Sequence, residues 1–192
     1  MPLDSPWIWV TLGCHLLARI AYVGFVWIGL TRQQASSWWT RRWGIEGGFG
    51  RFRRGAAIVM AIDAVSFVAL CLVGWGTLPA VVPRAPAIAI GVVLVLLGIG
   101  TKLWAARTLG DKAYYWYNFF APAAPVAAAV TGPYRYLQNP MYTVGYLQTY
   151  GFALVTGSLA GLAASLFDQA AILVFHWRVE RTHFERATRR TA

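Results

Sequence analysis

The residues best suited to chemistry lie where a polar, proline-containing stretch precedes the last long apolar run. Pro140 lacks a backbone donor and suits the first turn of a helix, and Asn139 before it is a good N-cap. Tyr142 and Gly145 are therefore expected in the first turns of a helix. Because a helix start carries free N–H groups and a partial positive charge, this start together with Arg135 predicts a site for a carboxylate or phosphate. The same residues also fit a simple cap at a membrane interface.

Arg19 is a charged residue in the middle of the first apolar run. A charge at that depth costs at least ~2.5–3.5 kcal/mol unless it is paired. We therefore expect Arg19 to face the interior of a helical bundle, with Asp63 and Asp168 as the available partners. His15 lies four residues earlier, on the same helix face. A buried ion pair and a substrate contact are both compatible with this pattern.

A run of aromatic residues between the third and fourth apolar segments could form the wall of a binding site. Tyr114 and Tyr117 are members of this run, which reads Tyr-Tyr-Trp-Tyr. Such rings bind cationic or lipid-like groups through cation–π contacts. They also form the aromatic belts of membrane proteins.

The composition indicates a membrane protein. The chain has 192 residues, of which 58% are hydrophobic and 12% charged, and this is too apolar for a soluble domain of that size. The net charge of +10 is carried mostly by Arg between apolar runs, which favours contacts to anionic lipid over nucleic acid. No zinc-type Cys/His spacing and no Gly-rich nucleotide loop is present, so neither a metal nor a nucleic-acid partner is expected.

The apolar runs predict a single all-α integral membrane domain over residues 1–192. About five spans are expected, and Gly157-Ser158 should break the last run into a tight helical hairpin. The first run lacks a basic leader and a small-residue cleavage site, so it is expected to be a retained helix. The predicted spans are 7–30, 55–78, 87–106, 141–156 and 159–176.

The distribution of basic residues predicts the orientation in the membrane. The Arg- and Trp-rich segment 31–54, interpreted as a polar loop with interfacial character, is expected on the cytoplasmic side. Segments 107–140 and 177–192 are expected there as well, and the N-terminus outside. Glu180 and the stretch around Tyr142 then lie on one side of a multi-pass protein, at the two ends of the hairpin.

The sequence Gly-Pro-Tyr-Arg-Tyr-Leu-Gln-Asn-Pro-Met-Tyr, which runs from Gly132 to Tyr142, resembles the signature of the isoprenylcysteine carboxyl methyltransferase and phospholipid methyltransferase superfamily. The resemblance extends from Trp104 to Glu180. It implies an integral-membrane enzyme that uses S-adenosylmethionine. Methyl transfer from a sulfonium needs in-line positioning and exclusion of water rather than a covalent nucleophile.

The resemblance implies roles for individual residues. Arg135 and the predicted helix start would bind the carboxylate or other polar edges of the cofactor. Glu180 would bind its ammonium or ribose, and Tyr142 would pack near its sulfonium or adenine. His176 is a candidate for proton transfer or an adenine contact. The remaining cofactor-side positions are Tyr134, Asn139, Pro140 and Gly145, and the candidate acceptor-side positions are Tyr114, Tyr117 and Arg19.

The chain departs from the superfamily pattern at three places. Gln138-Asn139 replaces an Arg-His pair, Arg181 replaces the second residue of a Glu-Glu pair, and the later Phe-Gly element is absent. The acceptor stays open between a prenylcysteine carboxylate, a phospholipid amine, a small thiol and another lipophile. An NADPH-dependent membrane reductase of steroid-reductase type and a non-catalytic, lipid-binding relative are the alternative functions.

Overall fold

The computed structural model describes residues 5–121 and 131–183, and every regular element within these ranges is helical. Four of the described helices are long and apolar enough to cross a membrane. They are α1 (Pro6–Ser36), α2 (Trp38–Val73), α3 (Arg84–Tyr114) and α5 (Leu159–Phe175), the last two together with the turns that continue them. This confirms the predicted all-α class and fits a multi-pass membrane protein.

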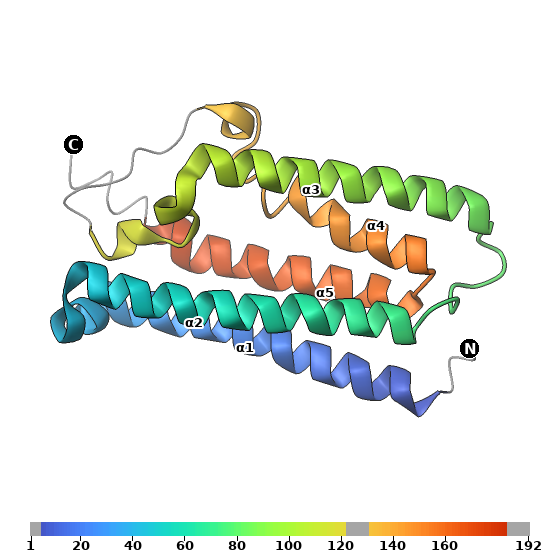
Figure 1. Ribbon diagram of the computed structural model, residues 1–192, viewed down its shortest axis with the longest axis horizontal. Helices are drawn as coiled ribbons and strands as arrows, with labels where there is room; N and C mark the ends of the chain where they lie inside the picture. Colours follow the sequence, from blue (N-terminus) through green and yellow to red (C-terminus); the bar gives the residue numbers. More distant parts are fainter. Residues whose placement is uncertain (1–4, 122–130, 184–192) are drawn as a thin grey trace.

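The helices form two pairs with α5 between them (Figure 1). α1 packs on α2, and α3 packs on α4 (Leu147–Thr156). α5 contacts α1, α2 and α4. The C-terminal end of α5, the end of α3 and the short helix η2 (Gly132–Arg135) lie at the same end of the bundle, away from the N-terminus. Segments that are distant in the sequence therefore meet at this end.

The predicted hairpin turn at Gly157-Ser158 is confirmed. Gly157 ends α4 in the left-handed conformation with φ 66°, which glycine adopts without a steric penalty. Ser158 caps α5, because its hydroxyl accepts a hydrogen bond from the backbone N–H of Gly161 at 3.0 Å. Arg84 at the start of α3 donates to the carbonyls of Leu154 and Val155 at 3.1 and 2.6 Å. The turn is thus held by local caps and by α3.

The first arm of the hairpin is shorter than predicted. The expected helix start near Met141 is wrong, because the chain there forms turns and the short helix η3 (Val144–Tyr146) before α4 begins at Leu147. The side chain of Asn139 accepts a 3.4 Å hydrogen bond from the N–H of Tyr142, so it caps a turn instead of a helix. The ten residues of α4 span only about 15 Å, half of a bilayer core.

The segment 31–54 is helical rather than a loop. α1 continues to Ser36, Ser37 adopts a left-handed conformation, and α2 begins at once. Gly44 interrupts the start of α2 with φ 70°. In the same way α3 runs beyond its predicted span to Tyr114, with a kink at Gly110. Residues 122–130 and 184–192, which belong to the predicted cytoplasmic segments 107–140 and 177–192, lie outside the described residues.

Small residues allow α3 and α4 to pack closely. A side chain added to Gly98 would place its Cβ 2.3 Å from the backbone nitrogen of Gln148, and one added to Gly91 would meet the carbonyl of Gly151 at 2.7 Å. Close backbone approach at small residues is typical of helix packing in membranes. Just before α4, Gly145 packs against the stem of Lys102 in the same way: a Cβ added to Gly145 would lie 2.8 Å from Cγ of Lys102.

Candidate active site

Glu180 is the centre of a cluster at the end of α5. It belongs to the π-helical turn η4 (His176–Glu180) and is only 7% exposed. The hydroxyl of Tyr142 donates to Oε1 at 2.8 Å, and the indole N–H of Trp116 donates to the same oxygen. Nδ1 of His176 lies 2.6 Å from Oε2. One buried carboxylate therefore gathers three aromatic side chains.

Local backbone structure brings these side chains together from three segments. Trp116 has a left-handed backbone with φ 60°, which turns the chain sharply after the end of α3. The carbonyl of Tyr142 accepts a 3.1 Å hydrogen bond from Gln169 on α5. The wide turn of η4 places His176 and Glu180 four residues apart on one face, and π-helical turns are frequent at functional sites.

Tyr134 in the Gly-Pro-Tyr-Arg motif lies within electrostatic reach of this cluster. Burial raises the pKa of its phenol above the usual value, and the negative charge of Glu180 raises it further. Tyr134 therefore stays protonated at neutral pH and can donate a hydrogen bond. Arg135 next to it is exposed, and within the described residues it neither contacts Glu180 nor lines the adjoining cavity.

A cavity of about 380 Å³ adjoins the cluster, and Tyr142 belongs to both. Tyr114 and Arg19, two of the predicted acceptor-side residues, also line this cavity. Tyr117 is placed elsewhere: its hydroxyl donates to Glu46 at 2.7 Å. The walls are mostly apolar, with polar side chains from α1, α2, α3, α4 and α5. Those with ionisable groups other than tyrosine are Arg19, Asp63, Lys102 and Asp168.

Arg19 forms the buried ion pairs expected from its position. Its Nε and Nη2 donate to the two carboxylate oxygens of Asp168 at 2.8 and 2.9 Å. Nη2 also lies 2.7 Å from Oδ2 of Asp63, and Nη1 donates to the hydroxyl of Tyr146 at 3.0 Å. His15 contacts Asp168 at 3.2 Å. Both predicted partners of Arg19 are confirmed.

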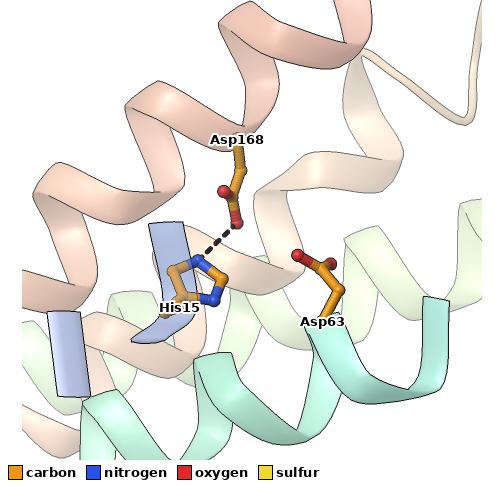
Figure 2. A group of neighbouring side chains, drawn as sticks. All are labelled: His15, Asp63 and Asp168. Carbon is orange, nitrogen blue, oxygen red and sulfur yellow. Dashed lines mark hydrogen bonds and ion pairs between the residues drawn. The ribbon is translucent and has the colours of Figure 1, made fainter. Parts of the chain in front are cut away.

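The carboxylates of this network point toward His15 and one another, as Figure 2 shows. Ligand atoms of His15, Asp63 and Asp168 lie within 4.8 Å of one another, a spacing that could hold a metal ion. The guanidinium of Arg19 already bonds to both carboxylates, and its positive charge would repel a cation there. An ion-pair network explains the cluster better than a metal site.

The remaining predicted cofactor-side residues shape the turn before α4. Pro140 is buried, and its carbonyl accepts a 2.8 Å hydrogen bond from the N–H of Gly145. Asn139 caps this turn. Their contacts hold Tyr142 in place. The sequence pattern did not single out Trp116 as a partner of Glu180, or Lys102 as a cavity residue. The available signals in the sequence were the position of Trp116 within the aromatic run and the position of Lys102 at the end of an apolar run.

Residues 86–189, more than half of the chain, match a family described as phospholipid methyltransferase. The chain belongs to this family. The match includes every residue of the Glu180 cluster, whereas His15, Arg19 and Asp63 lie outside it. The site at the end of α5 is thus within the part shared with other phospholipid methyltransferases.

Fungal proteins named phosphatidylethanolamine N-methyltransferase are similar to this member of the phospholipid methyltransferase family. The Schizosaccharomyces pombe protein is 33% identical over 137 residues, which are 70% of this chain and 15% of the relative. The Eremothecium gossypii protein is 28% identical over 142 residues, 70% of this chain and 17% of the relative. A Saccharomyces cerevisiae protein is 35% identical over 97 residues, which are 50% of this chain and 11% of the relative. The chain spans less than a fifth of these relatives, and no solved structure matches it.

Proposed function

We propose that this chain transfers a methyl group from S-adenosylmethionine to the amine of a phospholipid. The family match and the names of the fungal relatives support this acceptor over a prenylcysteine carboxylate or a small thiol. The observation that carries the proposal is the buried Glu180 cluster, which adjoins a cavity between apolar helices through one shared residue, Tyr142.

The chemistry of Glu180 fits the cationic groups of this cofactor. A carboxylate can accept about four hydrogen bonds, and the carboxylate of Glu180 accepts three, from Trp116, Tyr142 and His176. The capacity that is left suits an ammonium. The rings of Tyr142 and Trp116 beside the carboxylate also favour positive charge over their faces. When bound, S-adenosylmethionine would supply a methyl group already activated on a sulfonium.

The side chains then have to position and shield the reactants. Tyr142 is held at its hydroxyl by Glu180 and at its carbonyl by Gln169, so its ring forms a fixed wall between the cofactor side and the cavity. The apolar cavity walls exclude water from the acceptor amine. His176 lies beside Glu180 and is available to hold a proton there. An amphiphilic acceptor would enter from the surrounding lipid.

We further propose that this site faces the cytoplasm, where S-adenosylmethionine is made. The segments at the site end of the bundle carry most of the basic residues, including Arg41, Arg42 and Arg178. Basic loops stay on the cytoplasmic side of membranes. Labelling of single cysteines placed at residues 42 and 79 in sealed cells tests this orientation, since only the latter should react with an impermeant reagent.

Calorimetry on the purified protein tests the cofactor. We expect saturable binding of S-adenosylmethionine, no binding of NADPH, and transfer of labelled methyl groups to phosphatidylethanolamine. Glu180→Gln should weaken cofactor binding by at least about tenfold, as expected for a lost charged hydrogen bond. Glu46→Gln is the matched control, because Glu46 is an exposed carboxylate paired with Lys112. Binding of NADPH alone, or equal binding by both variants, would contradict the proposal.

A further inference from the structure

We propose that the cavity beside Tyr142 is the acceptor site, in which Asp63 receives the N–H groups of the phospholipid amine and Lys102 binds the phosphate. This inference rests on the proposed methyl transfer and adds the residues that select the acceptor. It is carried by two charged side chains that line one cavity without pairing with each other. Neither residue belongs to the Glu180 cluster.

Asp63 has an unused hydrogen-bond acceptor. The residue is only 6% exposed, and its Oδ2 is paired with Arg19 at 2.7 Å. Its Oδ1 has no hydrogen-bond partner among the described residues. Buried polar atoms are nearly always satisfied, and a charged one left alone is costly. Rotation about the last torsion of an Asp side chain is soft, so a donor in the cavity can reach this carboxylate. The amine of a lipid headgroup is such a donor.

Arg19 does not remove this need for a cation. Its guanidinium forms a bidentate ion pair with Asp168 through Nε and Nη2, and only Nη2 also contacts Asp63. One guanidinium between two carboxylates leaves one negative charge in excess among Arg19, Asp63 and Asp168. A protonated amine, free or partly methylated, beside Asp63 would balance that charge. Before methyl transfer it would give one N–H proton to the carboxylate of Asp63, so that the nitrogen lone pair forms the new N–C bond while the S–C bond of the donor breaks and the demethylated donor leaves.

Lys102 supplies the complementary positive charge at a second point of the cavity. Its stem lies against Gly145, and its Nζ lies 4.9 Å above the ring of Tyr146. No described carboxylate lies within ion-pair distance of Nζ. An ammonium on a flexible stem is a common ligand of phosphate. The cavity therefore presents one cation and one anion, which matches a zwitterionic headgroup.

The size and position of the cavity agree with this assignment. A volume of about 380 Å³ lies in the usual range for small-molecule sites and can hold a headgroup with the start of its glycerol. Val95, Ile99 and Phe152 provide apolar wall for the chains. Because Tyr142 borders both the cavity and Glu180, an amine in the cavity lies next to the proposed cofactor site.

The assignment predicts selectivity by N–H groups. Phosphatidylethanolamine and its mono- and dimethyl forms offer at least one N–H to Asp63 when protonated, whereas phosphatidylcholine offers none. We expect the wild-type protein to bind phosphatidylethanolamine at least about tenfold more tightly than phosphatidylcholine, the range expected for a charged hydrogen bond. These two affinities can be measured without a methyl donor by titrating the protein with short-chain lipids in detergent and recording the quenching of tryptophan fluorescence. Soluble phosphoethanolamine in a parallel titration distinguishes the lipid from its free headgroup.

Two substitutions separate the two contacts. Asp63→Asn should weaken binding of phosphatidylethanolamine by about tenfold and leave phosphatidylglycerol unchanged, while Lys102→Met should weaken both. Asp111→Asn is the control, because Asp111 is an exposed partner of Arg53 outside the cavity. The wild-type preference for phosphatidylethanolamine over phosphatidylcholine stands as a test even if a variant fails to fold.

The outcomes distinguish this inference from the proposed function. Wild-type protein without preference for phosphatidylethanolamine, or Asp63→Asn protein with wild-type lipid affinity, would overturn the acceptor site while S-adenosylmethionine binding is retained. Protein that binds phosphatidylethanolamine through Asp63 but never binds S-adenosylmethionine would overturn the proposed methyl transfer and leave the lipid site standing.

Discussion

The hydroxyl of Tyr142 donates a 2.8 Å hydrogen bond to Glu180, and the same tyrosine lines the cavity that Asp63 and Lys102 also line. This relationship joins the two ends of the α4–α5 hairpin. Glu180 lies after the second arm, and Tyr142 lies in the turn before the first. A change at Tyr142 should therefore affect both the cofactor side and the acceptor side.

Tyr142→Phe and Tyr142→Ala should differ in a graded way. Phe keeps the ring and removes one hydrogen bond, which is worth about 0.5–1.5 kcal/mol, so affinity for S-adenosylmethionine should fall about two- to tenfold. Ala also removes the wall of the cavity and should impair lipid binding as well. Calorimetry with each ligand measures both effects. Tyr136→Phe is the control, since Tyr136 is 73% exposed. Equal behaviour of all three variants would contradict the role of Tyr142.

Several features could be predicted from the sequence because a strong local or energetic rule fixes them. The cost of a charge in a bilayer required partners for Arg19, and only Asp63 and Asp168 were available within the spans. Glycine followed by a capping serine is a strong break in an apolar run, and the chain turns at Gly157-Ser158. The meeting of Glu180 with Tyr142 followed from placing both ends of the hairpin on one side.

Other features depend on tertiary contacts that a single sequence does not reveal. Asn139 and Pro140 are residues typical of a helix start. In the structure, hydrogen bonds to the Asn139 side chain and to the Pro140 carbonyl form a turn there, and the helix begins only later. Trp116 reaches Glu180 because of its left-handed backbone, which is unusual for a large residue and has no sequence signature. The motif residue Arg135 is exposed, whereas Tyr134 before it is half-buried and within electrostatic reach of Glu180.

Replacing Arg19 should strongly destabilise the fold. Arg19→Met keeps most of the side-chain volume but leaves Asp63 and Asp168 buried without their cation, which should cost about 3–5 kcal/mol. Thermal unfolding in detergent, followed by circular dichroism, measures the loss. Arg53→Met is the matched control: its ion pair with Asp111 is half exposed and should contribute at most about 1 kcal/mol. Similar midpoints for the two variants would show that the buried network does not hold the bundle.

Ser158→Ala should loosen the hairpin. The serine is fully buried, and its loss leaves the buried N–H of Gly161 without its acceptor. Loss of an N-cap costs about 0.5–2 kcal/mol, and burial favours the upper part of that range. Hydrogen exchange at the start of α5 should report faster opening than in wild type. Ser36→Ala serves for comparison, because Ser36 is exposed and bonds only within α1. Unchanged exchange at Gly161 would argue against the cap.

Gly98→Ala should separate α3 from α4, whereas Gly100→Ala two residues later should not. A Cβ at Gly98 would lie 2.3 Å from the backbone nitrogen of Gln148, and backbone cannot rotate away as a side chain can. Overpacking of this kind costs about 1–3 kcal/mol. A Cβ at Gly100 meets nothing within 4 Å, so alanine there should be neutral or stabilise α3 by up to about 1 kcal/mol. Because α4 is held against α3 next to Lys102, the Gly98 variant should also bind phosphatidylethanolamine more weakly. Unfolding midpoints together with lipid titrations measure both effects. A Gly98 variant as stable as the Gly100 variant would show that this close packing does not support the site.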